Sequence, residues 1–170
     1  MVLLRASRPG DLAFVTALER RPDHLEAIGQ WTDLEHLATM QSPKREHWII
    51  EVDGSPGGYL IAYDGRAQEA GIYVKRILVA DKNRGTGTLA LAKYLDRAFG
   101  VLQAKFAWLI VYEANARGHA VYRRLGFQRF DPVGEVARRL AETAEAPGPG
   151  AFRMLLKARD WETGGGLLQP

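Results

Sequence analysis

Two glycines, flanked by basic residues, follow an apolar stretch near the middle of the chain. Residues 77–88 read Ile-Leu-Val-Ala-Asp-Lys-Asn-Arg-Gly-Thr-Gly-Thr, which is typical of a strand, a polar turn and the start of a helix. Amides at a helix N-terminus lack partners within the helix, and the helix dipole attracts anions there. Gly85 and Gly87 carry no Cβ, so a ligand can approach the main chain closely, while Lys82 and Arg84 add positive charge. The stretch indicates a backbone site for phosphate, although glycine is also common in ordinary strand-to-helix turns.

A second polar segment, further along the chain, carries a candidate for proton transfer. Asn115 is placed to cap a helix, and Tyr122 follows about two helical turns later, so both side chains can line one side of that helix. The asparagine can reach a ligand amide, and the phenol can give or accept a proton. Either residue alone is more typical of an N-cap or of a core aromatic. Both together, downstream of the glycine turn, favour a ligand site.

The residue types exclude several other kinds of chemistry. The chain of 170 residues contains no cysteine, so disulfides, thiolate metal sites and cysteine nucleophiles are excluded. The four histidines do not have the spacing of metal ligands, and no Gly-x-Ser-x-Gly motif is present to indicate a serine hydrolase. We therefore expect no bound metal.

Charge and hydropathy limit the partners. The net charge is +3 and the pI is about 9.3, but the basic residues are scattered among acids rather than gathered in a nucleic-acid-binding stripe. No apolar run approaches the ~20 residues that cross a bilayer, and Arg5, Arg8 and Asp11 interrupt any signal-peptide core. We expect a cytoplasmic protein that binds neither nucleic acid nor membrane.

The elements that must position these groups follow from hydrophobic periodicity. We expect strands at residues 3–5, 47–52, 58–63, 72–80, 106–112, 127–130 and 151–157. We expect helices at residues 7–21, 32–40, 88–99 and 115–125, and a weak helical stripe in an insert at 131–150. Gly100 is placed to end the third helix in a left-handed conformation. Residues 1–160 are expected to form a single domain, and 161–170 a flexible tail.

Two motifs in this order carry a family resemblance. The turn Lys82-Asn-Arg-Gly85-Thr-Gly87 is similar to a pyrophosphate turn of the form Gln/Arg-x-x-Gly-x-Gly/Ala. The pattern Asn-x-x-x-x-Ala-x-Tyr-x-x-x-Gly-Phe is matched by Asn115, Ala120, Tyr122, Gly126 and Phe127. With these motifs and this order of elements, residues 3–157 resemble the GNAT superfamily of acyl-CoA-dependent N-acyltransferases.

The resemblance implies an α+β fold in α/β/α layers, with a central mixed, mostly antiparallel sheet of about six to seven strands and about four flanking helices. The sheet is expected to splay between its fourth and fifth strands, where the pantetheine arm of the cofactor enters. The implied activity is N-acetylation of a primary amine, in which the amine attacks acetyl-CoA directly and no covalent enzyme intermediate forms. A non-catalytic acyl-CoA-binding or regulatory module on the same fold is the alternative, and the presence of Tyr122 favours catalysis. A dinucleotide-binding fold is disfavoured, because the strands before the glycines are typical of antiparallel hairpins.

The resemblance also implies roles for individual residues. Main-chain groups of Ile77, Leu78 and Val79 are expected to bond the pantetheine arm in the manner of an added strand. Asn115 is expected to bond the pantetheine as well, and Tyr122 to protonate the departing thiolate as a general acid. The turn that would hold the pyrophosphate comprises Lys82, Asn83, Arg84, Gly85, Thr86, Gly87 and Thr88.

Two departures from the family pattern leave questions open. Lys82 stands where the family has Gln or Arg, and lysine binds an anion as a point charge rather than as a fork. Ile110 stands where family members that acetylate ribosomal protein N-termini have a glutamate. Glu113, Glu69 or a chain of waters could take the proton of the acceptor ammonium instead, and the sequence does not choose among them.

The amine acceptor is the least defined part of the prediction. The resemblance implies an acceptor site built by the first helices and a late strand connection, with candidates in Trp31, Glu35, His36 and the insert at 131–150. The acceptor could be a peptide N-terminus, a lysine, a polyamine, an amino sugar or a small xenobiotic amine. A monomer and a homodimer are equally compatible with the sequence.

Overall fold

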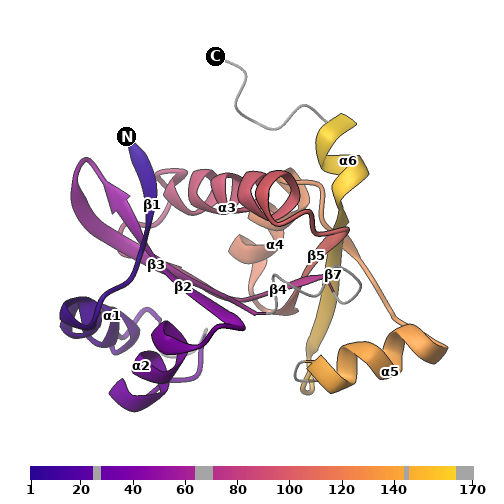
Figure 1. The fold of residues 1–170 in the computed structure, drawn as a ribbon, viewed down its shortest axis with the longest axis horizontal. Helices are drawn as coiled ribbons and strands as arrows, with labels where there is room; N and C mark the ends of the chain where they lie inside the picture. The colour runs from indigo at the N-terminus through magenta and orange to yellow at the C-terminus, as the bar shows by residue number, and fades with distance from the viewer. Residues whose placement is uncertain (25–27, 64–70, 144–145, 164–170) are drawn as a thin grey trace. The chain divides into compact units, whose positions relative to one another are not determined.

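A computed structural model describes residues 1–24, 28–63, 71–143 and 146–163 (Figure 1). Among these residues, no helix is both long and apolar enough to cross a lipid bilayer. The elements in chain order are β1 (Val2–Ala6), η1 (Pro9–Asp11), α1 (Leu12–Glu19), α2 (Asp33–Gln41), β2 (Arg45–Val52), β3 (Ser55–Tyr63), β4 (Ile72–Val79), α3 (Thr86–Asp96), η2 (Arg97–Val101), β5 (Phe106–Tyr112), α4 (Ala116–Arg124), β6 (Gln128–Arg129), α5 (Gly134–Thr143), β7 (Ala151–Lys157) and α6 (Ala158–Thr163).

The described strands form one seven-stranded sheet in the order β1-β2-β3-β4-β5-β7-β6. The pairs β1–β2, β2–β3, β5–β7 and β6–β7 are antiparallel, whereas β4 and β5 are parallel. The parallel ladder comprises only Ile72↔Ala107 and Tyr73↔Trp108, whereas β5 and β7 pair from Phe106↔Lys157 to Tyr112↔Ala151. Within the described residues, the ladder between β4 and β5 ends after these two pairs. The expected α+β fold is confirmed.

The chain divides into two compact units, of which the first comprises residues 1–63 and 74–94. Its core contains Tyr59 and Ile61 of β3, packed with Val15 and Leu18 of α1 and with Leu78 of β4. Tyr59 and Ile61 share one face because successive side chains of a strand point to opposite sides of the sheet. This unit contains the predicted phosphate turn.

Neighbouring residues of β2 show what covers each face of the sheet in this unit. His47 contacts His36 of α2, with His47 Nε2 and His36 Nδ1 3.1 Å apart. The next residue towards the N-terminus, Glu46, accepts a hydrogen bond of 2.7 Å from the Tyr94 hydroxyl of α3. Helices α1 and α2 therefore lie on one face of β2 and β3, and α3 lies on the other (Figure 1).

The second unit comprises residues 64–73 and 95–170. Tyr73 stacks on Trp108 beside the parallel ladder, with ring centroids 4.2 Å apart. Phe152 of β7 is buried and meets His119 of α4 edge-on, with centroids 5.1 Å apart. Helix α4 therefore covers one face of β7 and holds Tyr122, the predicted proton donor, in this unit.

The end of the chain differs from the prediction of a tail that starts at residue 161. Residues 158–163 form α6, and Trp161 is only 9% exposed. Its indole N–H donates a hydrogen bond of 2.9 Å to Asp96 Oδ1, and its ring lies 6.5 Å from that of Phe99. A tryptophan with both an apolar contact and a hydrogen-bond acceptor is stable when buried, which explains the extra helix. Residues 164–170 lie outside the described residues.

Candidate active site

The turn after β4 presents main-chain donors that the described chain does not use. Helix α3 begins at Thr86, and the amide of Leu89 is the first to donate to a carbonyl, that of Gly85, at 3.0 Å. Within the described residues we find no hydrogen bond from the amides of residues 82–88. Unpaired amides at a helix N-terminus attract an anion. The structure therefore provides the main-chain donors that the sequence predicts.

The structure accounts for glycine at one of the two glycine positions of this turn. Gly85 has φ +76°, in the left-handed region that strains other residues, and Asn83 shares that region at φ 67°. Gly87 has no positive φ, and among the described residues a Cβ at this position would meet only Val79 Cγ1, at an ordinary 3.8 Å. Neither backbone strain nor internal packing therefore requires glycine at residue 87. Close approach of a ligand would require it.

Residues 77–79 form the end of β4 and lead into the turn. Leu78 is buried, and Ile77 and Val79 are half-buried. On the β3 side, Gly58 lies so close that a Cβ there would be 2.4 Å from the Leu78 carbonyl oxygen. The missing side chain of Gly58 therefore lets β3 close tightly against this part of β4.

Lys82 and Arg84 behave differently from each other. The Lys82 ammonium donates to Asp23 through both its carboxylate, at 2.7 Å, and its main-chain carbonyl, at 2.6 Å. The Lys82 ammonium, followed by Arg21, lowers the pKa of Asp23 to about 2. Arg84 is exposed and has no ion pair within the described part of the chain. The positive charge of Lys82 is thus already paired with the carboxylate of Asp23, whereas that of Arg84 is not paired within the described residues.

Asn115 caps helix α4, as its position in the sequence predicts. Its Oδ1 accepts a hydrogen bond of 2.9 Å from the amide of Gly118. A Cβ on Gly118 would lie 2.7 Å from Asn115 Nδ2, so the glycine makes room for the cap. The carbonyl end of the Asn115 side chain is therefore committed to the helix, and within the described residues Nδ2 donates to no acceptor.

Tyr122 lies on α4 and is half-buried. Its ring meets Phe127 edge-on, with centroids 6.0 Å apart. Burial raises the pKa of its phenol to about 12, and no described residue forms a hydrogen bond with the hydroxyl. Tyr122 is therefore protonated at neutral pH and has a proton to donate.

The candidate bases are less well placed. Glu113 is exposed, and one of its oxygens lies 3.7 Å from the Arg129 guanidinium. The other candidate, Glu69, lies outside the described residues. Glu113 as the base stays a prediction.

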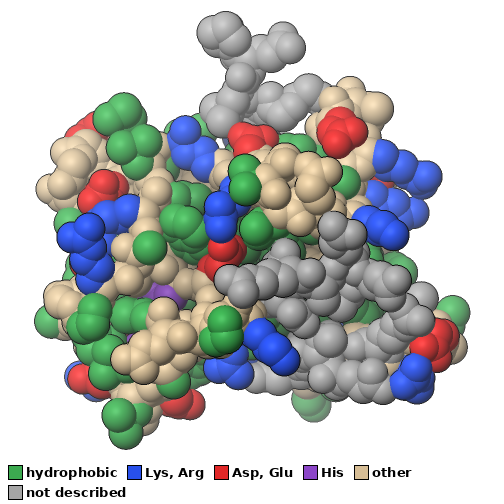
Figure 2. Space-filling model, viewed as in Figure 1, with side chains coloured by type: hydrophobic (Ala, Val, Ile, Leu, Met, Phe, Trp, Pro, Cys, Tyr) green, Lys and Arg blue, Asp and Glu red, His purple; other side chains and the backbone are tan. Residues whose placement is uncertain are grey.

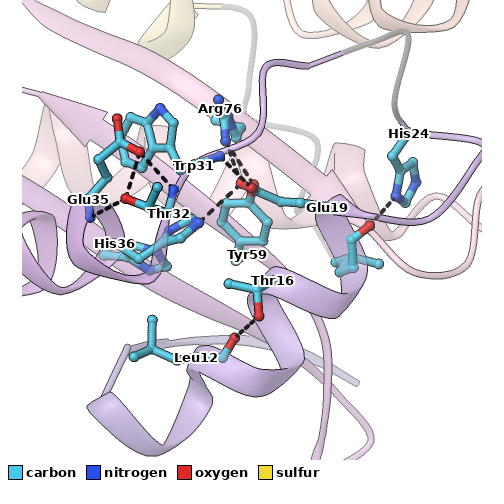
Figure 3. A network of polar contacts seen from close by, with 12 residues as sticks. Leu12, Thr16, Glu19, His24, Trp31, Thr32, Glu35, His36, Tyr59 and Arg76 are labelled. Carbon is cyan, nitrogen blue, oxygen red and sulfur yellow. Dashed lines mark hydrogen bonds and ion pairs between the residues drawn. The ribbon is translucent and has the colours of Figure 1, made fainter.

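A buried polar cluster in the first unit was not anticipated from the sequence (Figure 3). Glu19, at the end of α1, is 1% exposed and accepts hydrogen bonds from the Tyr59 hydroxyl and the Arg76 guanidinium. The amide of Trp31 donates to the other oxygen, Oε2, at 3.0 Å, and His36 Nε2 lies 3.3 Å from Oε1. One carboxylate thus joins α1, α2, β3, β4 and the segment before α2.

The cluster continues outwards through two imidazoles. His36 contacts His47, and His47 Nδ1 lies 2.7 Å from the Ser7 hydroxyl. Burial, and then the charge of His36, lower the pKa of His47 to about 4. Burial alone would raise the pKa of Glu19, but hydrogen bonds led by those of His36 and Tyr59 lower it to about 2. At neutral pH Glu19 is therefore ionised opposite Arg76, and His47 is neutral.

This cluster corrects one of the three residues named as candidates for the acceptor site. His36 is fully buried and bonded within the cluster, so it does not line a surface. Glu35 accepts hydrogen bonds from the Thr32 amide, at 2.7 Å, and hydroxyl, at 2.9 Å, which together cap α2. Trp31 is half-buried, with the Arg76 guanidinium 4.9 Å from its ring centroid. The signal that could have revealed the cluster is Arg76, whose neighbours on the same face of β4, Val74 and Leu78, are apolar. A charge on an apolar face implies a buried partner.

Comparison with known proteins identifies the family to which this fold belongs. The model of the acetyltransferase (GNAT) family matches residues 13–127, so the chain belongs to that family. No curated protein sequence matches significantly. The predictions of the family and of an acetyltransferase are confirmed.

Solved structures with the same fold include a spermidine N-acetyltransferase from Vibrio cholerae in complex with CoA and spermine. It is 17% identical, with a TM-score of 0.73, and the match covers 95% of this chain and 98% of that one. An aminoglycoside acetyltransferase in complex with coenzyme A is 20% identical, with a TM-score of 0.73 over 96% of this chain and 98% of its own. Another structure of an aminoglycoside acetyltransferase, with paromomycin and acetyl-CoA, gives 20% identity and a TM-score of 0.73 over 98% and 99%.

Proposed function

We propose that the protein transfers the acetyl group of acetyl-CoA to a primary amine by direct attack of the amine on the thioester. The observation that carries the proposal is the turn after β4, whose amides have no partner within the described residues. Gly87 in that turn is required neither by its φ nor by packing. Both properties suit a diphosphate bound by main-chain donors. The family match, and the coenzyme A present in the similar structures, support the same ligand.

The proposed reaction needs one proton donor and one proton acceptor. The lone pair of the amine nitrogen forms a bond to the thioester carbon, and the sulfur leaves with the electrons of the carbon–sulfur bond. Tyr122 gives the sulfur its proton, since burial keeps the phenol protonated at neutral pH. The attacking nitrogen loses a proton to Glu113 or to a chain of waters. Because the acyl group passes directly to the amine, no protein nucleophile is required, in agreement with the absence of cysteine.

The remaining cofactor contacts involve the main chain and one amide side chain. The end of β4, residues 77–79, is proposed to bond the pantetheine arm through main-chain groups. Asn115 is proposed to donate from Nδ2, because its Oδ1 is already used by the helix cap. An Asn115→Asp replacement would keep the cap and remove that donor, which separates the two roles.

The proposed acceptor is a small molecule or a peptide that carries a primary amine. Spermine and paromomycin are present in the similar structures, and both belong to amine classes that the sequence leaves open. The test is release of free thiol from acetyl-CoA with a panel of polyamines, amino sugars and peptides, followed by the mass of the product. A gain of one acetyl group on an amine is expected. Binding of coenzyme A without thiol release for any amine would instead favour the non-catalytic module.

Replacement of Tyr122 by Phe tests the chemical step. We expect kcat to fall by about 10²–10⁴-fold, with the KM for acetyl-CoA nearly unchanged, because only the proton donor is removed. Tyr112→Phe is the matched control, since Tyr112 is 52% exposed and makes no hydrogen bond through its hydroxyl within the described residues. An unchanged kcat in Tyr122→Phe would remove this residue from the mechanism.

A further inference from the structure

The second unit contains a cavity that none of the groups discussed above uses. Its volume is about 570 Å³, within the range of small-molecule sites. It is lined by Lys105, Phe106, Phe130, Leu155, Lys157, Ala158 and Arg159. No residue proposed for acetyl-CoA or for proton transfer is among them, so the cavity needs an explanation of its own.

The floor of the cavity is apolar, and the sheet register explains why. Phe106 and Trp108 of β5 share a face with Leu155 of β7, because Trp108 pairs with Leu155 and residues two apart point the same way. Phe130 follows β6 and is held beside β7 by a hydrogen bond of 3.0 Å from its amide to the Arg153 carbonyl. The Phe106 ring fills the space beside Gly71, where a Cβ would lie 2.4 Å from the ring. Phe106, Phe130 and Leu155 are all half-buried rather than covered.

The rim of the cavity is positively charged. Lys105 precedes β5, Lys157 ends β7 and Arg159 lies on α6, and all three side chains are exposed. A hydrogen bond of 2.9 Å from the Ala158 amide to the Lys105 carbonyl brings these segments together. Figure 2 shows Lys and Arg side chains gathered at the edge of the molecule where α6 lies in Figure 1.

The positive charges at this rim are only partly balanced. Arg159 Nε lies 3.6 Å from Asp160 Oδ1. Within the described residues, neither Lys105 nor Lys157 forms an ion pair, and no Asp or Glu lines the cavity. Like charges gathered around an apolar surface repel one another, and a bound anion would relieve that repulsion.

We infer that this cavity binds a small amphipathic carboxylate, with its alkyl or aryl body on Phe106, Phe130 and Leu155 and its charge between Lys105 and Lys157. The apolar floor removes hydrocarbon from water, and the two ammonium groups select the sign of the headgroup. A polyamine or an amino sugar would be repelled by the same rim. The site therefore differs in chemistry from the acceptor site of the proposed reaction, and the inference does not depend on that reaction.

The test uses decanoate as the probe and decyltrimethylammonium, with an equally long chain and opposite charge, as its control. Isothermal titration of the full chain is expected to show binding of decanoate and at least tenfold weaker binding of the cation. Titrations are run with and without coenzyme A. Equal affinity for the two probes, or loss of decanoate binding when coenzyme A is added, would overturn the inference.

Variants locate the probe. Lys105→Gln with Lys157→Gln should weaken decanoate binding about three- to tenfold, as expected for two exposed charges. Lys44→Gln, an exposed lysine of the first unit, is the matched control and should leave the affinity unchanged. Phe130→Ser should weaken decanoate binding further, because it removes part of the apolar floor. An equal affinity of the double lysine variant and the control, with both folded by circular dichroism, would show that the probe binds elsewhere.

Discussion

Polar groups are concentrated in two regions of the first unit. In one region they are paired with each other, and in the other they are not. In the cluster around Glu19 (Figure 3), the carboxylate is 1% exposed and accepts hydrogen bonds from side chains and from main chain. In the turn after β4, the amides of residues 82–88 donate to nothing within the described residues, and residues 83–85 are exposed. The carboxylate in the first region already has internal donors, whereas the amides in the second have no acceptor within the described residues.

The difference separates a structural role from a binding role. A buried charge whose partners are all internal fixes the elements that supply those partners, and it offers no free group to a substrate. Unpaired main-chain donors at the surface cost little while water solvates them, and they remain available to an anion. Damage to the cluster should therefore change stability but not cofactor affinity, and a bulky side chain at Gly87 in the turn should do the reverse.

The largest effect is expected from Glu19→Ala. The change leaves the Arg76 guanidinium buried without its counter-charge, and loss of one partner of a buried pair typically costs about 3–5 kcal/mol of unfolding free energy. Urea unfolding measures this loss, and calorimetry should show that the folded fraction still binds coenzyme A with unchanged Kd.

Two further variants sharpen this test. Glu113→Ala, which removes an exposed ion pair with Arg129, should change the unfolding free energy by less than about 1 kcal/mol. The double replacement Glu19→Met with Arg76→Met should recover part of the loss, because no buried charge is then left alone. A Glu19→Ala protein as stable as the Glu113→Ala control would show that the cluster is not structural.

Acid should weaken the same cluster without any mutation. The pKa of His47 is about 4 in the fold and about 6.5 in an unfolded chain, so between these values the unfolded state binds the extra proton. The unfolding free energy should therefore fall as the pH drops from about 6.5 to about 4, by roughly 3 kcal/mol for this group. Glu19, with its pKa lowered to about 2, adds a second loss as the pH falls below about 4.5. The measurement is urea unfolding at several pH values, and His47→Gln should remove most of the dependence above pH 4.5.

Features that depend on residues close together in the sequence could be predicted from it, whereas features that depend on residues far apart in the sequence could not. The strands, the glycine turn and the cap at Asn115 depend on local periodicity and on neighbouring residues, and they were predicted. The contact of Glu19 with Arg76 joins residues 57 apart in sequence, and nothing local selects that pair among other acids and bases. Trp161 was likewise assigned to a tail because its acceptor, Asp96, lies 65 residues away.

The prediction of where the third helix ends was also wrong. Gly100 was expected to end its helix in the left-handed region. Instead the chain continues through a π-helical turn at residues 97–101, and Gln103, with φ 55°, is the residue in that region. The Gln103 side chain donates to the carbonyl of Gly100 at 2.6 Å. A hydrogen bond that satisfies this helix end lets a non-glycine residue occupy the strained position.

The smallest effect on stability, and the sharpest contrast with the cluster, is expected in the turn itself. Gly85→Ala should lower the unfolding free energy by about 1–2 kcal/mol, because its φ of +76° is unfavourable for a residue with a Cβ. Gly87→Ala meets no such strain and should be as stable as Gly100→Ala, a control where a Cβ would meet nothing within 4 Å.

Gly87→Leu should weaken coenzyme A binding at least tenfold in calorimetry while its unfolding free energy stays near that of Gly87→Ala, since only the ligand needs the space. If Gly87→Leu binds coenzyme A as tightly as Gly100→Ala does, the unpaired amides of this turn are not the cofactor site, and the contrast with the Glu19 cluster loses its functional meaning.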